Sequence, residues 1–271
     1  MKKHTLAGAL TFSLLTAASQ AALSIDFGNG AVEAGYTAFA TPHETAGTGA
    51  LQTISTSFVN TGAANVDLSA AWPNTTSLAV RNSIVRGAGN NASWTDTTGI
   101  GLVQDWLGSD TRAGNGNWDG AVGTSTYLNL TLGGLPAGTY SWTSYHHDTE
   151  NIHTAFSVSL DTGSGSSALA DGYGTDGSAG GSPDSETDGS PGRAFTFADM
   201  DAKGSIYTTT FTADGTNDVT FQFAPYSGAI APAVHNQFFF INGFELEQIP
   251  EPSTGLLGLI SAALFGLRRR R

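Results

Sequence analysis

Short runs of β-forming residues, separated by turn residues, fill the middle of this chain and limit what it can fold into. Clusters of Gly, Pro, Asn and Asp stand between the runs, as they do between strands in all-β proteins. Helical periodicity is weak throughout, and only residues 101–108 predict one or two helical turns, with Trp106 packing that helix on a sheet. The pattern predicts an all-β sandwich or barrel. The runs are 24–28, 35–40, 52–59, 77–85, 126–132, 139–146, 154–160, 205–213, 218–224 and 236–247.

The N-terminus has the three parts of a secretory signal peptide. Lys2 and Lys3 give a charged start, residues 6–18 are apolar, and Ser19-Gln20-Ala21 supplies small residues for cleavage. We expect 1–21 to be a signal helix that is cut after Ala21, so that the body crosses the inner membrane.

The C-terminus has a second three-part arrangement: Pro250-Glu251-Pro252, an apolar stretch at 255–267, and a terminal cluster of Arg268, Arg269, Arg270 and Arg271. The apolar stretch spans roughly 20 Å as a helix, short of the ~30 Å hydrocarbon core, although arginine side chains extend its reach. We expect a short hydrophobic helix that is a transient transmembrane anchor, with the arginines held on the cytoplasmic side.

This arrangement over 250–271 resembles the C-terminal sorting signal of PEP-CTERM proteins, which exosortases of Gram-negative bacteria recognise. The resemblance implies an exosortase-type partner. It also implies export to the cell surface or an extracellular polysaccharide matrix.

The body between the signals, 22–249, predicts one domain with a strongly acidic balance. It has five basic and 22 acidic residues, a formal charge of −17, so a nucleic-acid surface has almost nothing to be built from. Cations such as Ca²⁺ and neutral glycans fit this charge better. The chain has no cysteine, which excludes disulfides and thiol chemistry.

Residues 161–193 are mostly Gly, Ser, Asp and Thr and predict a flexible, exposed acidic loop. Within it, Asp184, Glu186 and Asp188 alternate before Gly189, as acids do in calcium loops, but Phe195 stands where the closing acid would be. The loop is therefore either a calcium site or a solvated acidic segment.

Three motifs in the body look like those of malectin-like and galactose-binding-like jelly rolls. They are Ile25-Asp26-Phe27-Gly28, the turn Gly133-Gly134-Leu135-Pro136-Ala137-Gly138 between two strands, and Asn242-Gly243-Phe244-Glu245-Leu246. The resemblance implies a jelly-roll sandwich whose first and last strands are neighbours in one sheet.

The densest polar cluster runs from Tyr145 to His153. His146 or His147 with Asp148 and His153 can be interpreted as metal ligands, although no established zinc spacing is present. The same groups can contact sugar hydroxyls. Alternatively, one histidine is buried and hydrogen-bonded at a strand end while the others belong to a loop.

Tryptophans are the second kind of candidate, because the apolar face of a sugar stacks on an exposed ring. Trp118, beside Asp119 in a Gly- and Asn-rich segment, is the first choice and Trp94 the second. Trp118 can equally be a lid over the end of the sandwich, and Trp142, inside a strand, is expected in the core.

The leading interpretation is a non-catalytic exported protein that binds or organises extracellular polysaccharide through Trp118, Asp119, His147 and Asp148. A structural surface protein without a ligand and a glycan-active enzyme are the alternatives. Catalytic motifs are missing: there is no Gly-x-Ser-x-Gly elbow, phosphate loop or HExxH.

Overall fold

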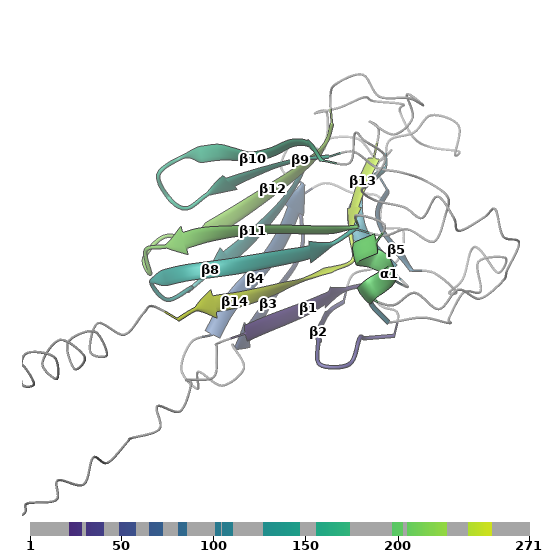
Figure 1. Cartoon of the computed structure of the whole chain (residues 1–271), viewed down its shortest axis with the longest axis horizontal. Helices are drawn as coiled ribbons and strands as arrows, with labels where there is room; N and C mark the ends of the chain where they lie inside the picture. The colour runs from purple at the N-terminus through teal and green to yellow at the C-terminus, as the bar shows by residue number, and fades with distance from the viewer. Residues whose placement is uncertain are drawn as a thin grey trace, which may run out of the picture.

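The computed structural model describes residues 22–28, 31–40, 49–57, 65–72, 81–85, 101–103, 105–110, 127–146, 156–173, 197–202, 205–226 and 238–250. Two mostly antiparallel sheets face one another across an apolar core, so the described part of the chain is a β-sandwich (Figure 1). The strands are β1 (Ala22–Phe27), β2 (Thr37–Phe39), β3 (Gly49–Ser57), β4 (Asn65–Trp72), β5 (Arg81–Val85), β6 (Asp105–Asp110), β7 (Leu128–Gly133), β8 (Gly138–Tyr145), β9 (Phe156–Asp161), β10 (Ser166–Tyr173), β11 (Ile206–Ala213), β12 (Val219–Pro225), β13 (Phe238–Ile241) and β14 (Gly243–Ile249).

One sheet has the order β11-β8-β14-β1-β2 and the other β10-β9-β12-β7-β4-β3. A smaller sheet, β13-β6-β5, lies at one end of the sandwich. β1 and β14 pair antiparallel, from Ala22 opposite Glu247 to Asp26 opposite Gly243. The expectation that the first and last strands are neighbours is therefore confirmed.

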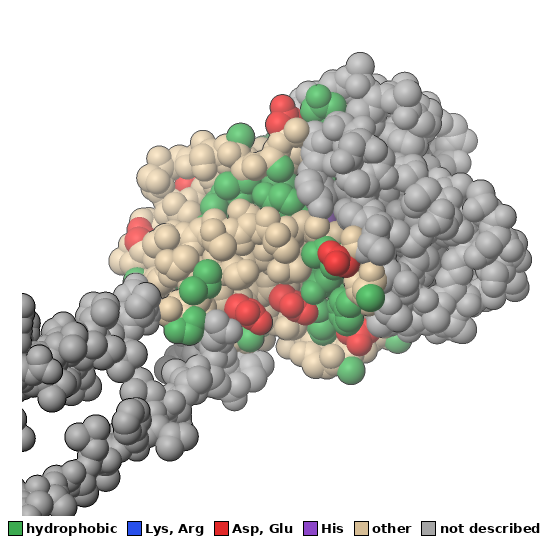
Figure 2. All heavy atoms as spheres, in the orientation of Figure 1, with side chains coloured by type: hydrophobic (Ala, Val, Ile, Leu, Met, Phe, Trp, Pro, Cys, Tyr) green, Lys and Arg blue, Asp and Glu red, His purple; other side chains and the backbone are tan. Residues whose placement is uncertain are grey.

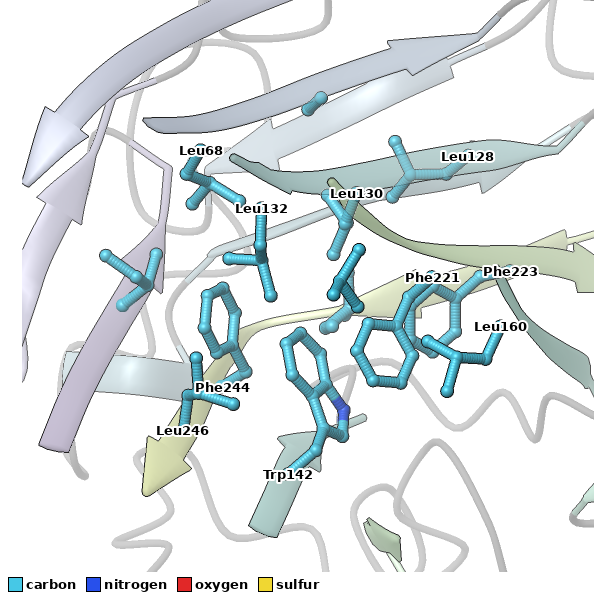
Figure 3. Close-up of a cluster of buried hydrophobic side chains, with 14 of the residues drawn as sticks. Leu68, Leu128, Leu130, Leu132, Trp142, Leu160, Phe221, Phe223, Phe244 and Leu246 are labelled. Carbon is cyan, nitrogen blue, oxygen red and sulfur yellow. The ribbon is translucent and has the colours of Figure 1, made fainter. Parts of the chain in front are cut away.

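Alternation of apolar and polar residues builds the core. In β7, Leu128, Leu130 and Leu132 are buried while the residues between them are half-buried. Trp142 lies between Phe221 and Phe244, with ring centroids 4.1 and 4.2 Å away, so it joins the two sheets (Figure 3). Its predicted place in the core is confirmed.

The Gly-rich turn predicted after β7 carries the chain from one sheet to the other. β7 belongs to the six-stranded sheet and β8 to the five-stranded sheet. Gly134 has a φ of 76°, a conformation that glycine adopts without strain, and the Tyr140 hydroxyl donates a hydrogen bond to the Pro136 carbonyl at 2.7 Å. Leu135 is buried and seals the core beneath this crossing.

The prediction of a flexible loop over 161–193 is wrong for the first part of that segment. Asp161 is the last residue of β9, and β10 follows as an edge strand that pairs with β9 through two register shifts. Little in the sequence indicates this strand because its residues are mostly small, and among its described side chains Leu169 and Ala170 are the ones that pack against the core. Residues 174–193 lie outside the part that the structure describes.

The helix predicted over 101–108 is also corrected. Only Gly101–Val103 forms a turn of 3-10 helix (η1), and Trp106 lies in strand β6, where its ring packs on Phe240 at 5.9 Å.

The 236–247 run is two strands rather than one. Asn242, fully buried, separates them: its N–H donates to the Tyr145 carbonyl, and its carbonyl accepts from the Phe27 N–H, each at 2.8 Å.

A short helix, α1 (Phe197–Ala202), was not predicted and covers the outer face of the five-stranded sheet at one end. Met200 is buried there with Leu102, Val103 and Tyr145 in a second, smaller apolar cluster.

Among the described residues no helix is long and apolar enough to cross a membrane. The predicted signal helix (1–21) and C-terminal hydrophobic helix (255–267) lie outside those residues.

Candidate functional site

The residues predicted to bind ligands lie outside the described residues: Trp118, Asp119, His147 and Asp148 for glycan, and Asp184, Glu186 and Asp188 for calcium. The same holds for Trp94, His153, Glu251, Pro252 and the four terminal arginines. Pro250 is described, and it is exposed directly after β14. The structure does show where the segments that carry these residues attach.

Three of these segments attach at one end of the sandwich, which we call the loop end (Figure 1). The segment with His147 leaves after His146 and returns at Phe156. The acidic segment leaves after Tyr173, which pairs with Phe156. The segment with Trp118 returns at Tyr127, beside Leu128, which pairs with Phe223. Because the His146 ring contacts both Phe156 and Phe223, these attachment points are neighbours.

The body begins and ends at the opposite end, which we call the tether end. Ala22, the first residue of β1, pairs with Glu247 near the end of β14. Ile249, the last residue of β14, pairs with Thr139 at the start of β8. The segments that precede Ala22 and follow Pro250 therefore attach opposite the loop end.

His146 lies at the loop end, directly after β8. Its ring is fully buried and stacks on Phe156 at 4.3 Å. Nδ1 lies 2.6 Å from the Phe240 carbonyl, which can only accept, so we assign the proton to Nδ1, with Nε2 accepting from the Ser144 hydroxyl at 2.8 Å. Burial lowers the pKa of His146 to about 4, partly offset by the hydrogen bond to Phe240.

This geometry fits the interpretation in which one histidine of the polar cluster fixes a strand end. Both ring nitrogens of His146 are already engaged, so it has no free lone pair for a metal. Within the described ranges no group of three His, Asp or Glu side chains could hold a metal ion.

A second polar cluster holds residues 31–36 against the five-stranded sheet. The buried Asp26 carboxylate accepts a hydrogen bond from the Glu33 N–H at 2.7 Å, and the Tyr36 hydroxyl donates to Glu245. Burial raises the pKa of Asp26 to about 6, and the charge of Glu33 adds to the rise. Burial and the bond to Glu245 hold the pKa of the Tyr36 hydroxyl above its usual range.

Sequence reasoning did not single out this cluster. The strict alternation of Phe244, Glu245 and Leu246 predicts that Glu245 points away from the core, which is the signal that could have found it. The partners of Glu245 are Tyr36 and Tyr145. They come from distant parts of the chain, and no local sequence pattern connects them to Glu245.

Hydroxyl side chains form a regular array on the outer face of the same sheet. On β8 and β11 they stand in register across the strands, and carboxylates of β14 flank them on one side. Figure 2 shows this face with acidic side chains and no described lysine or arginine. Such a surface can donate to and accept from uncharged hydroxyl groups. The pairs are Thr143 with Thr208, Ser141 with Thr210 and Thr139 with Thr212, beside Glu245 and Glu247.

Comparison with known proteins identifies the C-terminal segment. The PEP-CTERM protein-sorting motif matches residues 248–271. The motif indicates that the chain is exported and sorted to the cell envelope or surface of a Gram-negative bacterium, as the sequence predicted, and it implies an exosortase as the processing enzyme. No curated protein matches the chain.

Among solved structures, a plant complex of the peptide RALF23 with FER and LLG2 is similar, with 10% identity, a TM-score of 0.37, and coverage of 85% of this chain and 40% of that one. A Paenibacillus xanthan lyase has 16% identity and a TM-score of 0.32, over 72% of this chain and 14% of that one. A family 35 carbohydrate-binding module from Clostridium thermocellum has 11% identity and a TM-score of 0.26, over 62% and 88%. The chain thus spans less than half the length of the first two.

Proposed function

We propose that this protein is a non-catalytic surface or matrix protein, sorted by its C-terminal motif, that binds or organises extracellular polysaccharide. The observation that carries the proposal is the opposition of the two ends of the sandwich. The sorting motif continues directly from the tether end, while the segments with Trp118 and His147 attach at the loop end. A body held at the tether end presents the loop end away from its point of attachment.

The chemistry of the candidate residues supports a glycan ligand. The ring of Trp118 supplies an apolar face for a sugar, while Asp119, His147 and Asp148 supply hydrogen-bonding groups that fix its orientation. The body's charge of −17 disfavours polyanions such as nucleic acid and leaves neutral glycans, or acidic glycans bridged by Ca²⁺, as the better partners. We assign the sandwich to the jelly-roll type, which the pairing of β1 with β14 supports.

The test is binding of the protein without its two terminal signals to a panel of polysaccharides, with and without Ca²⁺. We expect Trp118→Ala to weaken binding by about 1–3 kcal/mol, the contribution of one aromatic face, and to leave the melting temperature nearly unchanged. Trp142→Ala is the control, since truncating this core ring should cost roughly 3–5 kcal/mol of stability. If Trp118→Ala unfolds the domain while the folded fraction binds normally, Trp118 is a lid and the site assignment is wrong.

The same panel separates the alternatives. A purely structural surface protein would bind none of the polysaccharides. A glycan-active enzyme would release reducing ends from one of them, and that result would overturn the non-catalytic proposal.

A further inference from the structure

The sorting motif overlaps the folded sheet. It begins at Gln248, whereas β14 continues to Ile249, so two residues belong both to the motif and to the sandwich. Pro250 follows at once and ends the strand, because proline has no N–H to donate. The sequence leaves no spacer between the folded body and the Pro-Glu-Pro element.

These two residues are held on one side only within the described part of the chain. Gln248 pairs with Tyr140 and Ile249 with Thr139, both on β8, whereas the pairing of β14 with β1 stops at Glu247. The side chain of Gln248 lies across the turn before β8, where its Nε2 donates a weak hydrogen bond to the Ala137 carbonyl at 3.3 Å. Among the described residues, Gln248 and Ile249 therefore pair with β8 alone, and separating them from it breaks no described pairing with β1.

The chain length beyond the strand makes this overlap important. Only residues 250–254 separate Ile249 from the apolar stretch, and five extended residues span at most about 18 Å. An enzyme that binds its substrate as an extended strand needs backbone N–H and C=O groups that are not already paired in a sheet. With the sandwich intact to Ile249, the folded body stands directly beside the segment that the enzyme must bind.

We propose that Gln248 and Ile249 leave β8 during sorting and become part of the extended segment that the exosortase binds. They are positioning residues for the sorting reaction: they close the sheet in the folded body and supply length and free backbone groups at the enzyme. The proposal rests on the sorting motif and is independent of polysaccharide binding.

A disulfide lock tests the proposal, because the chain has no cysteine of its own and the periplasm is oxidising. Thr139→Cys with Ile249→Cys would join a directly opposed cross-strand pair and prevent the end of β14 from separating. Thr139→Cys with Thr212→Cys is the matched control, since it uses the same residue of β8 but joins it to β11 and leaves β14 free. Both variants are made in the full-length precursor.

Processing of the precursor is followed by pulse-chase and fractionation, with the disulfide verified by gel shift. We expect the lock to slow processing at least 10-fold and the control pair to be processed at the normal rate. Adding reductant to membranes that contain the locked precursor should restore processing, which also shows that the locked protein is folded and recognisable. Processing of the verified lock at the control rate would overturn the proposal, as would a block that reductant does not relieve in a protein with normal thermal unfolding.

Discussion

His146 ties the stability of the sandwich to pH, because a neutral imidazole is built into the core. Its folded pKa of about 4 lies below the ordinary value of 6.5, so the unfolded chain takes up the proton first as pH falls. The stabilisation is complete above about pH 6.5 and is lost as pH falls to about 4, by about 3 kcal/mol. Denaturant unfolding at pH 7 and pH 4 should show this loss.

The matched variant is His146→Gln, whose amide can donate to the Phe240 carbonyl but does not titrate. It should be less stable than the wild type at pH 7 and should lose about 3 kcal/mol less on acidification. Equal losses in the two proteins would mean that His146 is not the group responsible.

Asp26 should act in the opposite direction. Its folded pKa of about 6 lies above the ordinary value of 3.8, so the folded state takes up the proton first as pH falls. Its contribution to stability is fully present below about pH 4 and is lost as pH rises to about 6, by about 3 kcal/mol. Asp26→Asn should remove this dependence. The stability of the variant relative to the wild type should therefore be higher at pH 7 than at pH 4. A variant whose pH dependence follows the wild type would contradict this assignment.

At the scale of elements, the sequence predicted strands where large apolar residues alternate, as in β7, β8 and β12. It missed β4, β6 and β10. The buried side of β4 is Val66, Leu68 and Ala70, and the residues between them include Asp67, which disfavours strands in isolation. In β6 the adjacent Trp106 and Leu107 are both buried, so the strand lacks the alternation of apolar and polar residues that indicates a strand in a sequence. β4 and β6 pair with strands far away in sequence, β7 and β13, which local propensity does not report, whereas β10 pairs with its neighbour β9 and its small residues give no alternating apolar pattern.

The candidate site shows the same limit. The pairing of β1 with β14 came from a resemblance, and the buried histidine was one of three interpretations of a single motif. The contacts among Tyr36, Tyr145 and Glu245 could not be predicted, because they require the register of β8 against β14.

The small sheet β13-β6-β5 depends on a close approach at Gly108. A Cβ atom there would lie 2.1 Å from the Phe239 carbonyl oxygen and 2.8 Å from the Phe240 Cα, both backbone atoms that cannot rotate away. We expect Gly108→Ala to destabilise the protein by about 1–3 kcal/mol or more. Gly133→Ala is the control, because its nearest contact is the Asp218 carboxylate at 3.1 Å, a side chain that can move, and it should change stability by less than about 0.5 kcal/mol. Thermal melts of the two variants test this prediction. Equal melting temperatures would show that the β6–β13 contact can relax.

For the whole molecule, the tether end and the loop end lie at opposite ends of the sandwich. The tether end closes the sheet with β1 and β14 and passes directly into the sorting motif. The loop end is braced by the buried ring of His146, which contacts aromatic residues of both β9 and β12. We therefore expect changes in the long segments at the loop end to alter the proposed polysaccharide binding without disturbing the strands that lead to the sorting motif.

Net charge acts on the molecule as a whole. With 22 acidic and five basic residues in the body, self-repulsion should lower its stability at low ionic strength, and NaCl should raise the melting temperature by screening. A calcium site at Asp184, Glu186 and Asp188 would add to this a rise with Ca²⁺ that exceeds the rise with Mg²⁺ at matched ionic strength, since Mg²⁺ requires stricter geometry. Replacing the three acids by Ala should then abolish the excess while the response to NaCl stays almost the same. Equal responses of the unmodified protein to Ca²⁺ and Mg²⁺ would reduce the effect to screening, and the acidic segment would be a solvated one.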